Sequence, residues 1–180
     1  WRGWLAIFSA GENEPEFAKE FAGEGGAHVA VSPDGKWLAA AFRPKDTPAK
    51  VRVFELPGMS ERVIIDDWKG EVSRLIFTPD SRTLLVTGGV FNSEGRISLW
   101  DVDTGKVAPL VEGALPNGFA AHAALSPDAK LLALADGQTL SVWDFPGRKI
   151  IKRIPQNIGG WVIALAFSPD RKTLAELTGS

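Results

Sequence analysis

A phrase of twelve residues occurs four times along this chain, and no other feature of the sequence restricts the fold as strongly. Aligned on their prolines, successive copies are 46, 48 and 42 residues apart, so the period is nearly constant. A period of this length indicates one supersecondary unit repeated along the chain. The copies are VSPDGKWLAAAF (31–42), FTPDSRTLLVTG (77–88), LSPDAKLLALAD (125–136) and FSPDRKTLAELT (167–178).

A second phrase recurs in phase with the first, as VRVFEL, ISLWDV and LSVWDF. Around the two phrases, short apolar runs alternate with turn residues, which is typical of strands. In Ser/Thr-Pro-Asp the proline sets φ for the first turn position and the aspartate can bond the backbone two residues on, so the motif predicts a hairpin turn. Each unit therefore predicts four antiparallel strands. In the second unit we expect them at 72–77, 82–88, 96–102 and 106–112.

Four short strands cannot bury a face of their own, whereas sheets stacked side by side around an axis cover one another. Hydrophobic residues make up 44% of the chain and charged residues 23%, which supplies apolar side chains for such a core. Three apolar columns recur in phase and are expected to fill it. They are Val31, Phe77, Leu125 and Phe167; Leu38, Leu84, Leu132 and Leu174; and Phe54, Trp100 and Trp143.

These phased motifs resemble the WD-repeat (WD40) β-propeller family over nearly the whole chain. The resemblance rests on Ser/Thr-Pro-Asp in all four copies, on Trp100-Asp101 and Trp143-Asp144, and on the turn Asp103-Thr104-Gly105. It implies an all-β propeller of four-stranded antiparallel blades. The chain departs from the family in lacking the Gly-His pair before the first strand of each copy. The family's His–Ser/Thr–Asp–Trp network is therefore not expected in full, and Asp136 is its one retained acidic member.

One repeat unit is divided between the two ends of the chain. Residues 161–180 match the first two strands of a unit, while 1–26 match the last two and place Phe8 in the tryptophan column. We therefore expect one domain over 1–180 with four blade-equivalents, one of them split, and complete blades at 27–70, 71–117 and 118–160. We expect it to be part of a larger propeller. A closed four-bladed ring and a homodimer joined through the half-blades stay open.

Composition excludes several classes of protein. The net charge is −2 and the Lys and Arg residues are dispersed, so no nucleic-acid partner is expected. No apolar run reaches the roughly 20 residues that span a bilayer, so no membrane partner is expected. Cysteine is absent, which excludes disulfides and thiolate metal sites. The cytoplasm is the expected compartment, but export stays open because the chain starts at Trp1 without an initiator methionine.

Few side chains in the sequence suggest catalysis or ligand binding. His28 and His122 occupy equivalent positions in two units, and Arg74 and Ala164 hold that position in the other two. If the first strand of each unit lines a central channel, then His28, Arg74 and His122 are the candidates for binding an ion or small ligand. The alternative is that they are ordinary residues of a repeat column. The four Asp residues of the Pro-Asp motifs are assigned to turn formation rather than to metal binding.

The remaining candidates are surface residues. Connections from the fourth strand to the next first strand, and from the second to the third, leave a blade on one face. Aromatic and charged residues at such a face are the usual anchors of a protein contact. We therefore expect a non-enzymatic scaffold for a protein or peptide partner, with no cofactor; the alternative is an enzyme or ligand binder acting through the channel. The expected partner-binding residues are Arg43, Lys45, Trp68, Glu71, Phe91, Phe119 and Trp161. For Trp68 and Trp161 the alternative is that their rings pack between neighbouring blades.

Overall fold

The computed structural model of the chain describes residues 2–22, 24–44, 48–68, 70–89, 95–109, 122–135, 139–156 and 161–179. All regular elements in these ranges are β-strands, and each sheet is antiparallel. The expectation of an all-β fold with repeated antiparallel sheets is therefore confirmed. Among the described residues no helix is long and apolar enough to cross a membrane.

Three four-stranded sheets, each in strand order of the sequence, make up the middle of the molecule. The first contains β3 (Glu24–Val31), β4 (Trp37–Pro44), β5 (Ala49–Glu55) and β6 (Ser60–Trp68). The second contains β7 (Glu71–Phe77), β8 (Thr83–Gly89), β9 (Gly95–Asp101) and β10 (Val107–Pro109). The third contains β11 (His122–Leu125), β12 (Leu131–Ala135), β13 (Thr139–Asp144) and β14 (Lys149–Pro155).

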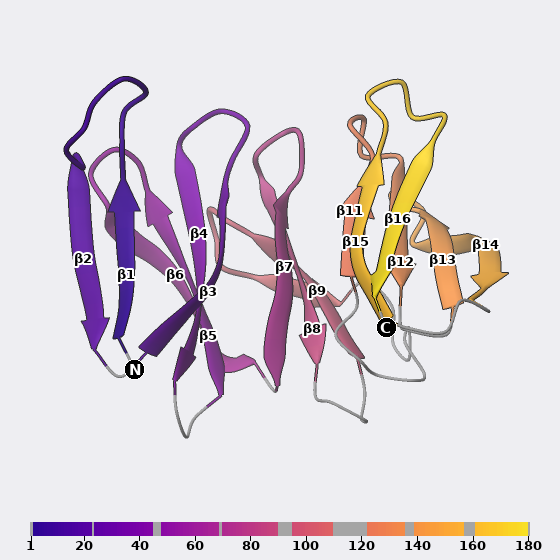
Figure 1. The fold of residues 1–180 in the computed structure, drawn as a ribbon, viewed down its shortest axis with the longest axis horizontal. Coiled ribbons are helices and arrows are strands. Elements are labelled where there is room, and N and C mark those ends of the chain that lie inside the picture. The colour runs from indigo at the N-terminus through magenta and orange to yellow at the C-terminus, as the bar shows by residue number, and fades with distance from the viewer. Residues whose placement is uncertain are drawn as a thin grey trace.

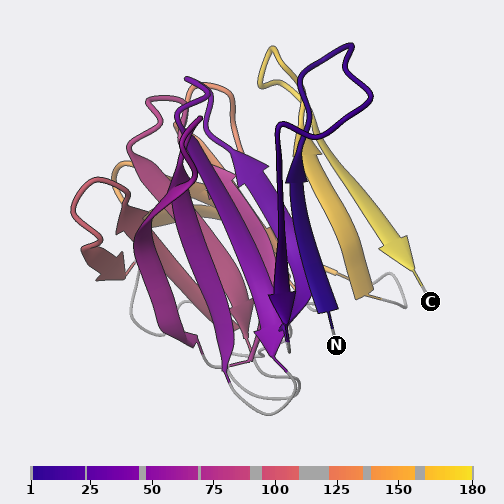
Figure 2. The same cartoon turned by 90° about the vertical axis from the view of Figure 1, so that its left-hand side faces the viewer.

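A two-stranded sheet lies at each end of the row: β1 (Arg2–Ile7) with β2 (Phe17–Ala22), and β15 (Trp161–Phe167) with β16 (Leu174–Gly179). In Figure 1 the β1–β2 sheet and the first two four-stranded sheets follow one another from left to right, and β15–β16 lies in front of the third. Figure 2 shows the first four-stranded sheet nearly broadside, with β1–β2 and β15–β16 on the same side of the view. Strand β3 lies beside β7, β7 beside β11, and β11 beside β15. These four are called the inner strands below.

The strands expected in the second unit match β7, β8 and β9 to within one residue at each end. Strand β10 covers 107–109 of the expected 106–112, and residues 110–112 lie outside the described ranges. One placement differs from expectation. Phe8 lies just beyond the end of β1 and is 56% exposed, whereas Phe54 and Trp143 of the same column are buried. The repeat period alone therefore overestimated the length of β1.

The core lies between the sheets, because each middle sheet packs against a neighbouring sheet on each of its faces. In β8 the side chains of Leu84 and Val86 pack against the first sheet, while Leu85 packs towards the third. All three are fully buried. A strand covered on two sides loses the polar and apolar alternation of a half-exposed strand, which accounts for the apolar run in TLLVTGG. Each sheet therefore depends on its two neighbours for burial.

The Pro-Asp motif forms the same hairpin turn in all four copies. In the first copy the Ser32 hydroxyl donates to Asp34 Oδ1 at 2.6 Å, and the backbone N–H of Lys36 donates to the same oxygen at 3.1 Å. Equivalent hydroxyl bonds reach Asp80, Asp128 and Asp170. The assignment of these aspartates to turn chemistry is confirmed by this pattern. We call this end of the molecule, at the top of Figure 1, the turn face.

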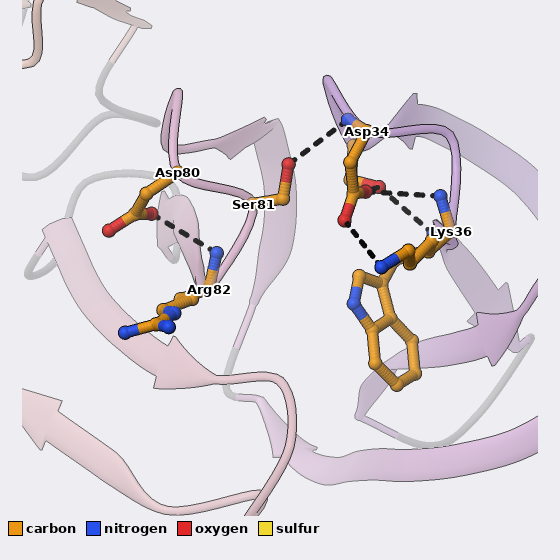
Figure 3. A network of polar contacts seen from close by, with 7 residues as sticks. Asp34, Lys36, Asp80, Ser81 and Arg82 are labelled. Atoms are coloured by element: carbon orange, nitrogen blue, oxygen red, sulfur yellow. Dashed lines mark hydrogen bonds and ion pairs between the residues drawn. The ribbon is translucent and has the colours of Figure 1, made fainter.

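Polar contacts also join neighbouring turns. The backbone N–H of Asp34 donates to the Ser81 hydroxyl at 3.1 Å, which connects the first and second sheets (Figure 3). Arg171 forms an ion pair with Asp128 and connects the third sheet to β15–β16. The turns therefore form polar contacts between neighbouring sheets as well as within their own hairpins.

Two tryptophans form hydrogen bonds to serines of their own strands. The indole Nε1 of Trp143 donates to Ser141 Oγ at 2.9 Å, and that hydroxyl donates to the Leu134 carbonyl oxygen at 3.2 Å. The second sheet repeats the first of these bonds, from Trp100 to Ser98 at 2.7 Å. Asp136, the expected acidic member, lies outside the described residues. The Trp–Ser pair thus satisfies the indole N–H in two sheets.

Candidate functional site

The strand order determines which residues share the end opposite the turn face. In an antiparallel sheet of consecutive strands, the first and third connections lie at one end and the second at the other. The ends of β4, β6 and β8, and the starts of β5, β7 and β9, therefore lie together at the bottom of Figure 1. We call this end the loop face. Its described residues include Arg43, Ala49, Glu71 and Gly89.

Arg43 and Glu71 form an exposed ion pair on the loop face. Arg43 Nη2 lies 2.7 Å from Glu71 Oε1, and the pair joins the end of β4 to the start of β7. Their side chains are 62% and 55% exposed. An ion pair this exposed contributes at most about 1 kcal/mol to stability. Both groups can therefore exchange this contact for one with a partner at little cost to the fold.

Trp68 lies in the core, which corrects the expectation that its ring is offered to a partner. Its exposed fraction is 0%, and it packs in the cluster between the first and second sheets. Its Nε1 donates to the Glu71 carbonyl oxygen at 3.1 Å, and the Arg96 guanidinium lies 5.1 Å from the ring centroid. The physical reason is that β6 continues as far as residue 68, so the ring reaches the neighbouring sheet. Trp68 therefore supports the loop face from the core side.

The other expected partner-binding residues are outside what the structure describes. Lys45, Phe91 and Phe119 fall in the gaps between described ranges. Trp161 begins β15, and its side chain is not among those described. The structure thus brings Arg43 and Glu71 together, and the roles of these four residues stay predictions.

Gly88 is a residue of the loop face that sequence reasoning missed. A Cβ placed on it would lie 1.9 Å from the Glu71 carbonyl oxygen, which is far inside van der Waals contact. Only glycine lets β8 approach the first residue of β7 this closely. The available signal was the pair Gly88-Gly89 at the end of an otherwise apolar strand, because glycine in a strand often marks close backbone approach.

The expected channel residues occupy matching places on three successive inner strands. His28 lies on β3, Arg74 on β7 and His122 on β11, and Ala164 holds the equivalent place on β15. Register shifts in β3, β7 and β15 stand directly beside these positions. Such bulges redirect side chains. Arg74 Nη2 donates to the Ile163 carbonyl oxygen at 3.0 Å and Nη1 donates to the Ser73 carbonyl oxygen at 2.8 Å, so the guanidinium reaches β15.

The two histidines share an electropositive, partly buried setting. Burial lowers the pKa of His28 below its ordinary value, and the charge of Arg74 lowers it further. Burial likewise lowers the pKa of His122, with smaller effects from Arg74 and His28. His122 Nδ1 is buried and has no hydrogen-bond partner among the described residues. At neutral pH the cluster therefore consists of two neutral imidazoles around one guanidinium. In the described ranges no three His, Cys, Asp or Glu residues are grouped as metal ligands.

Comparison with known proteins identifies distant relatives. WD repeat and SOCS box-containing protein 1 from Homo sapiens is 29% identical over 127 residues, which is 69% of this chain and 28% of the relative. The protein of the same name from Xenopus tropicalis is 30% identical over 124 residues, 68% of this chain and 27% of the relative. The chain thus spans just over a quarter of the length of these relatives. No protein-family model matches it.

The aligned region of these relatives covers more than two thirds of the chain, so it includes several of the repeats. The repeated antiparallel sheets of this chain are consistent with the WD repeats that the relatives' name states. The distant homologues of this chain are therefore WD-repeat proteins, similar to it over about two thirds of its length.

Proposed function

We propose that this chain is a non-enzymatic scaffold that presents its loop face to a protein or peptide. The observation that carries the proposal is the relationship to WD-repeat proteins, because the sites of such folds reside in surfaces built on rigid sheets. Fold alone does not specify function. The loop face adds a local reason: it carries an exposed pair of opposite charges on a well-packed base.

The base of the face is rigid where the pair is attached. Trp68 donates to the Glu71 carbonyl oxygen, and the absence of a side chain at Gly88 lets β8 pack against the same carbonyl. The backbone that carries Glu71 is thus held from two sides. The backbone that carries one of the two charges is therefore ordered before a partner binds, which reduces the entropy lost on binding. We infer that the partner places an acidic and a basic group against Arg43 and Glu71.

Selection from a random peptide display library tests this proposal. Peptides selected on the immobilised chain would be measured by fluorescence anisotropy against wild type and the double variant Arg43→Ala/Glu71→Ala. We expect affinity to fall about tenfold or more, the size of a substantial interface contribution. The control is Lys36→Ala/Arg82→Ala, which removes two charges from the turn face and is expected to change affinity less than about twofold. Selected peptides that respond only to the control variant would contradict the proposal.

We also propose that β1–β2 and β15–β16 are the two halves of one blade, giving four blade-equivalents. The β15–β16 hairpin carries the Ser168–Asp170 turn of a first and second strand. The β1–β2 sheet packs Leu5 and Phe21 onto Leu38 and Phe54 of the first sheet. That face is covered only in part. Val29 and Val31, which pair with Ala40 and Leu38 and so share the face, are 66% and 55% exposed.

A further inference from the structure

We propose that His28, Arg74 and His122 form a binding site for a small oxyanion, a carboxylate or a phosphate group, on the inner strands. This goes beyond the scaffold function and is independent of the loop face. The three residues lie on neighbouring strands at equivalent places of the repeat. Side chains at equivalent positions of stacked sheets point into the same inner region. Their proximity is supported by the electrostatic influence of Arg74 on both rings.

The chemistry of the cluster favours an anion over a metal. A guanidinium offers five donors in a planar fork that suits carboxylate and phosphate oxygens. Arg74 uses one Nη1 donor and one Nη2 donor on backbone carbonyls, so further donors stay available for a bound anion. The nearby positive charge repels a metal cation. Two imidazoles can each donate one N–H to an anionic oxygen.

The surroundings supply no competing negative charge at the described positions. The inner strand β15 contributes Ala164, which has no titratable group. The second strands that pair with the cluster are equally uncharged at the register positions. These partners are Ala41 opposite His28, Thr87 opposite Arg74 and Ala135 opposite His122. An anion would therefore meet the positive charge without displacing a carboxylate.

His122 Nδ1 provides a second and independent observation in favour of a ligand at this place. It is a buried polar atom without a hydrogen-bond partner among the described residues. Buried polar atoms in native proteins are almost always hydrogen-bonded to protein, water or ligand. An anion on the Arg74 guanidinium would stabilise the protonated form of this ring, whose Nδ1 then donates. Anion binding is therefore coupled to proton uptake, and affinity should rise as the pH falls from about 8 to about 6, through the range where imidazole titrates.

The chain contains only two histidines, and both belong to the cluster, so every histidine NMR signal comes from the proposed site. Proton–carbon NMR of the two imidazole Cε1–H signals gives both pKa values in chloride and in inorganic phosphate at equal ionic strength. We expect phosphate to raise both pKa values by about one unit, as a nearby opposite charge does. The same pKa values are measured in acetate as a second test anion. A response to acetate as well assigns the site to carboxylates and phosphates, and a response to phosphate alone assigns it to phosphates.

Arg74→Gln is expected to abolish the response to phosphate and, in chloride alone, to raise the pKa of both histidines because a neighbouring positive charge is lost. Arg74→Lys retains the charge without the planar fork and is expected to retain the chloride values but lose most of the response. Arg62→Gln, which removes an exposed arginine that pairs with Glu55, is the matched control and should behave as wild type. Histidine pKa values that are equal in chloride, acetate and phosphate would overturn the proposal.

Discussion

Asp128 shows how much one turn residue does in this chain. Its carboxylate accepts hydrogen bonds from the Ser126 hydroxyl and the Lys130 backbone N–H, and it pairs with Arg171 of the next turn. Partial desolvation raises the pKa of Asp128, but the bonds from Ser126 and Arg171 outweigh it and lower the pKa from 3.8 to about 2. The charged form is thus favoured by folding.

Asp128→Asn should therefore destabilise the chain in a pH-dependent way. The folded pKa lies below the unfolded value, so the charged carboxylate contributes stability above pH 3.8 that is lost as the pH falls towards about 2. We expect the thermal midpoint of the variant to lie below that of wild type at pH 6, and the two to converge near pH 2. Calorimetry at a series of pH values measures this. A midpoint difference that is constant with pH would show that the ion pair with Arg171 contributes nothing.

At this scale the sequence predicted the chemistry of the turns but not their backbone. Ser/Thr-Pro-Asp correctly indicated a hairpin with the aspartate bonded to its own turn. The residue after each aspartate has positive φ in all four copies, yet only Gly35 is a glycine. Ser81, Ala129 and Arg171 adopt the same conformation. Propensity places glycine at such positions, and here the two bonds to the aspartate override it.

Strand β8 packs closely against the strands and sheets around it. It is buried on both faces, and Gly88 lies against the backbone of Glu71 in β7. Next to this contact the β7–β8 register shifts between Val72 and Arg74. The bulge and the glycine together bring the two strands close at the loop face while aiming Arg74 inward. The same register shift thus lies beside the loop face and beside Arg74 of the inner cluster.

Gly88→Ala is expected to destabilise the fold by about 1–3 kcal/mol, because its Cβ has no space and backbone must move. Gly26→Ala is the matched control: Gly26 lies in β3 of the first sheet, near the same end of the molecule, and a Cβ there meets nothing within 4 Å. The control should be neutral or stabilising by roughly 0.5 kcal/mol, since alanine has less freedom to lose on folding. Urea unfolding compares the two. Equal effects would mean that β7 and β8 can separate without cost.

Strand limits explain where sequence reasoning failed. Trp68 was expected on the connection that follows the fourth strand of the first unit. The acidic residues Asp66 and Asp67 directly precede it. In the structure β6 runs through them, because backbone pairing with β5 continues to Ala49 opposite Trp68. Pairing with a neighbouring strand is not visible in a local pattern.

The whole molecule presents an incomplete cover at the first sheet. The β1–β2 sheet packs over Phe42 and Phe54, while Val29 and Val31 of the inner strand stay exposed on the same face. The proposed blade would add a first and second strand, of the β15–β16 type, over those valines. The period of the repeat indicated this division from the sequence. Closure within one chain, pairing with a copy and continuation into a larger propeller would each cover this face, and the repeat period is the same for all three.

Val29→Lys tests the proposed blade. If the face becomes covered in solution, the lysine must be buried, and the free energy of unfolding should fall by at least about 1.5 kcal/mol, the contribution of a buried valine. Val107→Lys alters an equally exposed valine on the outer strand β10 and should change stability by less than about 0.5 kcal/mol. Light scattering then distinguishes a closed 19.4 kDa monomer from a dimer. A neutral Val29→Lys would contradict the proposed blade.

Each sheet packs mainly against the sheets beside it, and this also bears on how such a gene can change. A duplication or loss of one whole repeat recreates every type of contact, because each sheet meets its neighbour through the same columns and the same turn. A cut inside a repeat leaves an uncovered face. Selection should therefore accept length changes in steps of one repeat, while single positions of the inner column, such as Ala164, stay free to diverge from copy to copy.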